Sequence, residues 1–110
     1  MFRVMGVWSD PEPEVLEEFA RHYHEVHVAL GLRVPELEGI TFVGNTELGE
    51  GGWFGSADMV FADREAALRS MASDEWKELA ADTALMIERF RVSVKLVIGD
   101  EEVAPLPDGA

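Results

Sequence analysis

Hydrophobic residues at alternate positions predict four β-strands. In residues 2–8, Phe2, Val4, Gly6 and Trp8 fall on one face and polar or smaller apolar groups on the other. The same period of two predicts the remaining strands at residues 39–47, 53–62 and 89–98. A glycine-rich segment separates the second and third of these strands, which indicates a hairpin.

In the third strand the alternation assigns each large side chain to a face. Trp53, Met59 and Phe61 are expected to share one face, and Phe54 is expected on the other. In the second strand Phe42 falls on the same face as Ile40. The face that carries Trp53, Met59 and Phe61 and the face that carries Phe42 are candidates for the side of the sheet that packs against helices.

Between the strands, apolar residues recur at helical spacing. A stripe predicts a helix from about Glu14 to about Leu32, and Pro35 prevents its continuation. A second helical segment starts after Asp63, a natural N-cap, and continues towards Met86. A break near Ser73 is expected within it, because the sequence there matches a further cap. The stripe of the first helix consists of Val15, Leu16, Phe19, Tyr23, Val26 and Leu30.

The resulting order, β-α-β-β-α-β, is that of the ferredoxin-like plait. It predicts an α+β fold with an antiparallel four-stranded sheet and two helices on one face. Residues 1–99 are expected to form one domain, followed by an acidic, proline-containing C-terminal tail at residues 100–110. The tail is either loose or a strap over a partner subunit. Because the other face of the sheet mixes polar and apolar groups, a homodimer is expected.

Charge and composition narrow the function classes. The chain of 110 residues has 22 acidic and 9 basic residues, a formal net charge of −13. Nucleic-acid and anionic-membrane partners are therefore disfavoured, since both require clustered Lys and Arg. The absence of cysteine excludes disulfides, thiol nucleophiles, zinc–thiolate sites and iron–sulfur clusters. With no targeting or spanning segment visible, a cytoplasmic location is expected.

All three histidines and the single tyrosine lie within residues 19–27. At about 100° per residue on an α-helix, His27 lies at the edge of the apolar stripe, one turn after Tyr23, and His24 points to solvent. His22 and His27 diverge by about 140° on such a helix, so they are not expected to share a metal ion. No metal site is expected.

His27 and Tyr23 form the candidate catalytic pair. Imidazole is the usual acid or base near neutral pH, and a phenol four residues away can reach it and donate to a substrate oxygen. The alternative is a boundary histidine bonded to the backbone beside a core tyrosine, which the residue pattern by itself favours.

Aromatic and glycine content admits a ligand cavity between the sheet and the helices. Large aromatic residues are mostly core residues, but glycines at strand positions 6, 44 and 55 remove side-chain volume there. No nucleotide or other cofactor motif is present, so cofactor-independent chemistry is expected. The candidate ligand-binding residues are Phe19, Phe42, Trp53, Met59 and Trp76.

Several of these residues match a known family pattern. Phe19, Tyr23, His27 and Leu30, followed by Pro35-Glu36-Leu37, resemble the EthD-like branch of the dimeric α+β-barrel proteins. Their pattern is Phe-x-x-Tyr-aromatic-x-x-x-His-x-Pro-Leu followed by Leu/Val-Pro-x-Leu. The resemblance implies a ferredoxin-like protomer, a homodimer formed through the sheets, and a cavity between sheet and helices. Its superfamily includes cofactor-free monooxygenases, cyclases, isomerases and haem-handling enzymes.

Two function classes stay open. In the first, an enzyme of cyclase, isomerase or monooxygenase type binds a small hydrophobic organic compound, His27 moves a proton and Tyr23 hydrogen-bonds the substrate oxygen. In the second, a non-catalytic or accessory protein binds such a compound. A haem-binding variant with His27 or His22 as axial ligand is the remaining alternative among enzymes.

Overall fold

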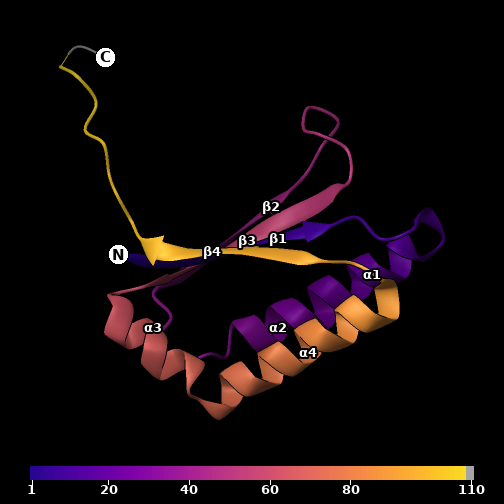
Figure 1. Ribbon diagram of the computed structural model, residues 1–110, viewed down its shortest axis with the longest axis horizontal. Helices are drawn as coiled ribbons and strands as arrows, with labels where there is room; N and C mark the ends of the chain where they lie inside the picture. Colours follow the sequence, from indigo (N-terminus) through magenta and orange to yellow (C-terminus); the bar gives the residue numbers. More distant parts are fainter. Residues whose placement is uncertain (109–110) are drawn as a thin grey trace.

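The computed structural model describes residues 1–108, which form one antiparallel sheet covered on one side by helices (Figure 1). The strand order is β2-β3-β1-β4, and every neighbouring pair is antiparallel. This topology confirms the expected α+β ferredoxin-like fold. The strands are β1 (Phe2–Ser9), β2 (Gly39–Gly44), β3 (Trp53–Phe61) and β4 (Val94–Asp100).

Two helical segments cover one face of the sheet (Figure 1). The first is continuous but changes its winding: a 3₁₀ turn (Pro13–Val15) leads into α1 (Leu16–His22), a π-helical turn (Tyr23–His27) and α2 (Val28–Gly31). The second segment consists of α3 (Arg64–Met71) and α4 (Asp74–Phe90).

The expected N-caps begin the two helices of the second helical segment. The Asp63 side chain accepts a hydrogen bond from the Ala66 backbone N–H at 2.8 Å, and the Ser73 hydroxyl accepts one from Trp76 at 3.1 Å. Each cap satisfies a backbone donor that the first turn leaves free. The predicted break near Ser73 is therefore confirmed, and it allows α4 to change direction relative to α3.

The last strand begins later than predicted. Helix α4 continues to Phe90, so the expected strand start at residue 89 is wrong. Arg91 ends the helix in the left-handed conformation, with φ 55° and ψ 42°. Phe90 and Val92 are buried, but as core residues before the strand and not as part of it. The second strand also ends earlier, at Gly44 instead of residue 47.

A β-bulge reverses the predicted faces at the start of β3. Trp8 pairs with Gly55 but Ser9 pairs with Trp53, which leaves Phe54 as an extra residue. Phe54 therefore points to the helices, where its ring centroid lies 4.8 Å from that of Phe19. Trp53 lies on the open face instead. The prediction that Trp53 shares the face of Met59 is wrong.

The core fills the layer between sheet and helices as two adjoining clusters. The predicted positions Phe19, Tyr23 and Met59 are all buried in it, with 0%, 3% and 7% of their surface exposed. One cluster consists of Phe2, Val4, Val34, Met59, Phe61, Ala66, Ala67 and Leu79. The other consists of Trp8, Phe19, Tyr23, Met86, Phe90 and Val92.

After β4 the chain leaves the sheet. Residues 101–108 have no regular secondary structure, and Figure 1 shows them running away from the sheet and the helices. Val103 and Leu106 are exposed there. Residues 109–110 of the predicted tail lie outside the described residues. Within residues 1–108, no helix combines the length and the apolar character needed to cross a membrane.

Candidate functional site

A cavity of about 320 Å³ lies between the helix-facing side of the sheet and the second helical segment, α3 and α4. Strands β1, β3 and β4, the π-helical turn, α3 and α4 all contribute to its wall. This volume is at the lower end of the range for small-molecule sites. Its main apolar side chains are Trp8, Met59, Met71, Trp76, Leu79 and Leu96.

Gly6 helps to keep this space open. A Cβ atom at this position would lie 3.4 Å from side-chain atoms of both Leu96 and Val94, so a larger side chain would compete for the same volume. Gly6 lines the cavity, whereas Gly44 and Gly55 do not. The expectation that strand glycines leave room for a cavity therefore holds at Gly6.

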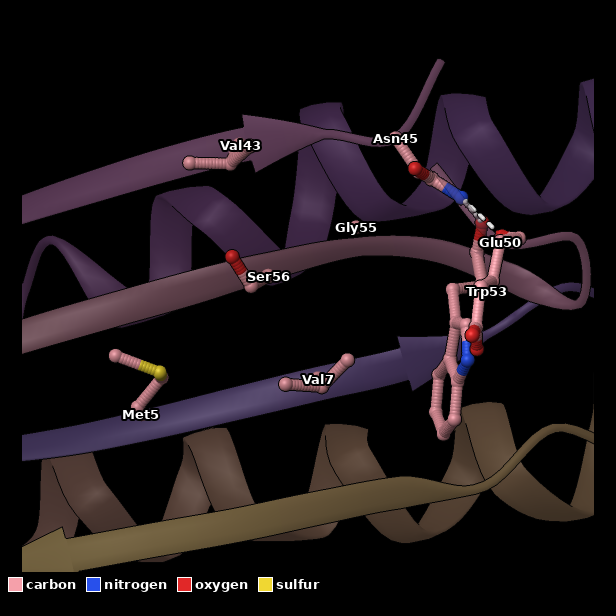
Figure 2. A pocket seen from close by; sticks show the side chains of 8 residues that line it. All are labelled: Met5, Val7, Val43, Asn45, Glu50, Trp53, Gly55 and Ser56. Carbon is pink, nitrogen blue, oxygen red and sulfur yellow. Dashed lines mark hydrogen bonds between the residues drawn. The ribbon is translucent and has the colours of Figure 1, made fainter. Parts of the chain in front are cut away.

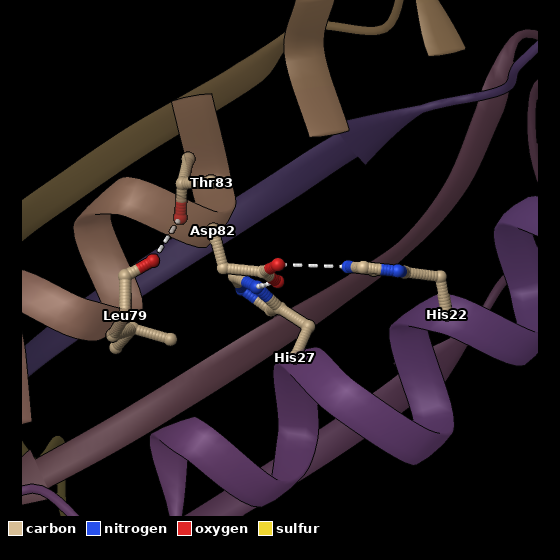
Figure 3. A network of polar contacts seen from close by, with 5 residues as sticks. All are labelled: His22, His27, Leu79, Asp82 and Thr83. Atoms are coloured by element: carbon tan, nitrogen blue, oxygen red, sulfur yellow. Dashed lines mark hydrogen bonds and ion pairs between the residues drawn. The ribbon is translucent and has the colours of Figure 1, made fainter. Parts of the chain in front are cut away.

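Two polar side chains, His27 and Thr83, reach the wall of this cavity. The Thr83 hydroxyl donates to the backbone carbonyl of Leu79 at 3.1 Å, as Figure 3 shows, so its remaining capacity towards the cavity is that of an acceptor. Among the described residues, no Lys, Arg, Asp or Glu lines this cavity. The wall thus has no Lys, Arg, Asp or Glu and is apolar apart from His27 and Thr83.

Asp82 on α4 joins two histidines (Figure 3). Its Oδ1 lies 2.8 Å from Nε2 of His22, and its Oδ2 lies 2.8 Å from Nδ1 of His27. Asp82 is 9% exposed, and the histidine side chains are 15% and 12% exposed. Because an ionised carboxylate only accepts hydrogen bonds, both contacting ring nitrogens donate to it.

The π-helical turn explains how both histidines reach one carboxylate. The backbone N–H of Val28 donates to the carbonyl of Tyr23, five residues earlier, in place of the usual four. The wider turn brings residues five apart onto one side of the helix. The predicted divergence of His22 and His27 by about 140° assumed a regular α-helix and is wrong for this structure.

The surroundings of His27 favour its neutral form. Burial lowers the pKa of His27 most and His22 lowers it further, so the pKa lies below its usual value although Asp82 raises it. Trp8 packs against the imidazole edge-on, with 5.1 Å between ring centroids. With the Nδ1–H directed at Asp82, the lone pair of a neutral ring is on Nε2. Among the described residues, Nε2 makes no hydrogen bond.

Tyr23 lies beside His27 but does not line the cavity. Its ring stacks near the imidazole at 5.9 Å and packs against Phe54 at 5.1 Å. Burial raises the pKa of Tyr23 to about 12, so the phenol stays protonated at neutral pH. The predicted neighbourhood of Tyr23 and His27 is thus present, while the cavity lies on another side of the imidazole.

The candidate ligand-binding residues divide into two groups. Met59 and Trp76 line the cavity together with His27. The other three do not line it: Phe19 is buried in the adjoining cluster, Phe42 packs against Tyr23 at 6.3 Å, and Trp53 lies across the sheet.

Sequence patterns did not identify Asp82 or Thr83 as site residues, although one signal was present. Leu79, Asp82 and Met86 recur at helical spacing and all three are buried. An acidic residue within such an apolar stripe needs a buried partner. That requirement points towards the histidines on the facing helix.

The open face of the sheet carries a different, shallower depression of about 300 Å³ (Figure 2). Met5, Val7 and Val43 form its floor, and Trp53 stands at one end. Asn45 donates to the backbone carbonyls of Glu50 and Trp53, at 2.8 and 3.0 Å, which fixes the adjacent hairpin loop. This depression contains no histidine or acid–base pair.

Comparison with known proteins gives matches in structure. No protein-family model matches the chain, and no curated protein matches it in sequence. An EthD-family protein from Bacillus halodurans C-125 has a TM-score of 0.79 and 23% identity, over 93% of this chain and 99% of that one. HapK from Hahella chejuensis has a TM-score of 0.65 and 13% identity, over 99% of this chain and 100% of that one.

A further match is a putative antibiotic biosynthesis monooxygenase from Deinococcus radiodurans, with a TM-score of 0.66 and 13% identity. It is covered completely, by 99% of this chain. At these identities the shared property is the fold. The resemblance to EthD-like proteins drawn from the sequence is therefore confirmed as a likeness of fold: the chain has the ferredoxin-like α+β architecture of EthD and antibiotic biosynthesis monooxygenase proteins.

Proposed function

We propose that the protein binds a small, uncharged, largely apolar organic compound in the cavity beside His27, and that His27 acts on it as a general base. One observation carries this proposal. The ring of His27 lines an apolar cavity while its Nδ1 is bonded to the buried carboxylate of Asp82 at 2.8 Å. A base oriented by a carboxylate, with its second nitrogen free, is the usual arrangement for proton abstraction.

The polar groups of the wall indicate what the ligand must offer. A neutral His27 accepts through Nε2, and Thr83 accepts through its hydroxyl oxygen. A ligand that supplies a hydrogen-bond donor, such as a phenol or an enol, satisfies one of these groups. A ligand without a donor leaves them unpaired in an apolar site, which costs about 1–3 kcal/mol for each buried group.

Charge disfavours anionic ligands. The cavity wall has no Lys or Arg among the described residues, and the chain carries a net charge of −13. A carboxylate in this cavity would lose its hydration without gaining a cationic partner. The same reasoning disfavours the haem variant, because haem brings two propionates. Together with the need for a hydrogen-bond donor, it favours a phenol or the enol form of a carbonyl compound.

The proposed chemical step is a proton transfer. The proton leaves an O–H or an acidic C–H of the ligand for Nε2 of His27, and the bonding electron pair stays on the ligand as phenolate or enolate. The imidazolium that forms is stabilised by Asp82. Isomerisation, cyclisation and reaction of the anion with oxygen all begin with this step. The monooxygenase names of the structural neighbours agree with the last of these.

The open face supports a homodimer as the working form. Val43 and Val97 lie on this face with 59% and 66% of their surface exposed, and Trp53 lies on the same face. Apolar groups exposed on one continuous face favour association. A second copy placed sheet against sheet would cover this face and leave each cavity on the outside of the pair. Native mass spectrometry tests this arrangement directly.

Tryptophan fluorescence can test ligand binding. The chain has three tryptophans, of which Trp8 and Trp76 line the cavity and Trp53 does not. In a Trp53→Phe background, quenching therefore reports the cavity. We expect 2-naphthol to bind once per chain and 2-naphthoate, its anionic analogue, to bind at least about tenfold more weakly. Equal binding of both compounds, or binding of neither, would refute the proposed ligand class.

Turnover then separates the two function classes. If bound phenols or enolisable ketones exchange a carbon-bound proton with solvent deuterium faster in the presence of the protein, His27 acts as a base. Stoichiometric binding without exchange across the panel would instead identify a binding or accessory protein.

A further inference from the structure

The pair of histidines on Asp82 raises a question of charge. Asp82 is buried, and its ion-pair partners among the described residues are His22 and His27. A buried carboxylate is costly unless a positive charge compensates it. One proton shared by the two imidazoles would provide that charge, so it matters which ring carries it.

The surroundings of the two rings differ. His27 lies between Trp8 and Tyr23, with ring centroids 5.1 and 5.9 Å away, and borders the apolar cavity. His22 has one aromatic neighbour, Phe90, at 6.1 Å, and does not line the cavity. A charged imidazole loses more hydration in the surroundings of His27. This difference in surroundings favours the positive charge on His22.

We infer that His22 is a positioning residue of the site, which carries the positive charge that compensates Asp82 and thereby leaves His27 as the neutral base. The inference rests on the proposed function for its purpose, but its charge assignment concerns the ligand-free protein. His22 would act through Asp82, on the oxygen opposite to the one that His27 uses.

Removal of His22 should change the acid–base behaviour of His27. The groups that face this ring are Asp82 from α4 and Tyr23 and His22 from its own helix, while β1 presents Trp8, which does not titrate. Asp82 raises the pKa of His27 and His22 lowers it, while burial lowers it most. Without His22, the full charge of Asp82 would act on His27 and favour its protonation.

Histidine ring NMR tests this prediction without a ligand. With three histidines in the chain, single His→Gln variants assign every ring signal. In wild-type protein we expect the proton of the unit to lie on His22, whose two ring nitrogens then both carry hydrogen, and His27 to be neutral with its proton on Nδ1. In His22→Gln, whose amide can still donate to Asp82, we expect the titration midpoint of His27 to rise by about one pH unit.

Exposed His24 provides the control, because His24→Gln should leave the His27 midpoint unchanged. An unchanged midpoint in His22→Gln would overturn the inference. So would a wild-type protein in which His27 takes up its proton before His22, a measurement that needs no variant to fold. Failure to bind 2-naphthol would refute the proposed function while leaving this charge assignment standing, so the two failures are distinguishable.

Discussion

The two faces of the sheet carry different kinds of side chain. The helix-covered face holds the core, the cavity and the His22–Asp82–His27 unit. The open face holds exposed apolar residues and an ion pair, Arg3–Asp58 at 2.6 Å, in which both side chains stay partly exposed.

Under the proposed function, this difference separates the site of chemistry from the surface for association. A titratable unit changes its behaviour when water is excluded, and only the helix-covered face excludes water here. The open face, by contrast, presents apolar area on a flat surface, which suits a second sheet. The two faces should therefore respond independently to substitution.

His27→Gln should have the largest functional effect. It removes the base while keeping a polar side chain of similar length, so we expect proton exchange or turnover of a bound ligand to fall about 10²–10⁴-fold. His24→Gln, on the exposed side of the same turn, is the matched control and should retain activity. The dimer should persist in both variants. Full activity in His27→Gln would show that His27 is not the base.

Phe54→Ala and Trp53→Ala test the β-bulge. Phe54 packs against Phe19 and Tyr23, so its truncation should lower the free energy of unfolding by about 3 kcal/mol. Trp53 lies on the open face, where truncation should cost less than about 1 kcal/mol in the monomer. Chemical denaturation at low protein concentration measures both. The reverse order of effects would contradict the register of β3.

Val97→Glu should weaken self-association without changing the cavity. The position is 66% exposed on the open face, and the charge would have to be desolvated between two sheets. We expect the dimer dissociation constant to rise at least about tenfold. Val103→Glu, in the exposed tail, introduces the same charge and should leave the constant unchanged. An unaffected dimer in Val97→Glu would place the interface elsewhere.

The smallest expected effect is on the pH dependence of stability. The pKa of His27 is lowered from 6.5 in the folded protein, so the unfolded chain takes up this proton first as the pH falls. The contribution of His27 to the free energy of unfolding should therefore decrease as the pH is lowered below about 6.5. His27→Gln should flatten this part of the profile in thermal unfolding, whereas His24→Gln should not.

Much of the fold could be predicted from the sequence because periodicity reports burial directly. The alternation of Phe2, Val4, Gly6 and Trp8 matches the buried face of β1, and the caps at Asp63 and Ser73 begin α3 and α4 as expected. These signals are local: each depends on a few residues and on the period of one element.

The features of the structure that the sequence patterns did not predict depend on contacts between elements. The extra residue at Phe54 inverts a face without breaking the alternation, and the left-handed Arg91 ends α4 where no glycine signals a stop. The π-helical turn likewise has no compositional signal, yet it decides that His22 and His27 meet at Asp82. His27 was identified from its residue type, its position one turn after Tyr23 and the family pattern, whereas its partner Asp82 required the fold.

The most direct test of the account is the ¹⁵N signal of Nε2 of His27 during titration with 2-naphthol. The account predicts that this nitrogen, unprotonated in the free protein, shifts towards the values of a protonated nitrogen as the ligand hydroxyl donates to it. The shift should saturate with the fluorescence signal from the cavity. Saturated binding with an unchanged Nε2 signal would contradict the role of His27 as the base that meets the ligand.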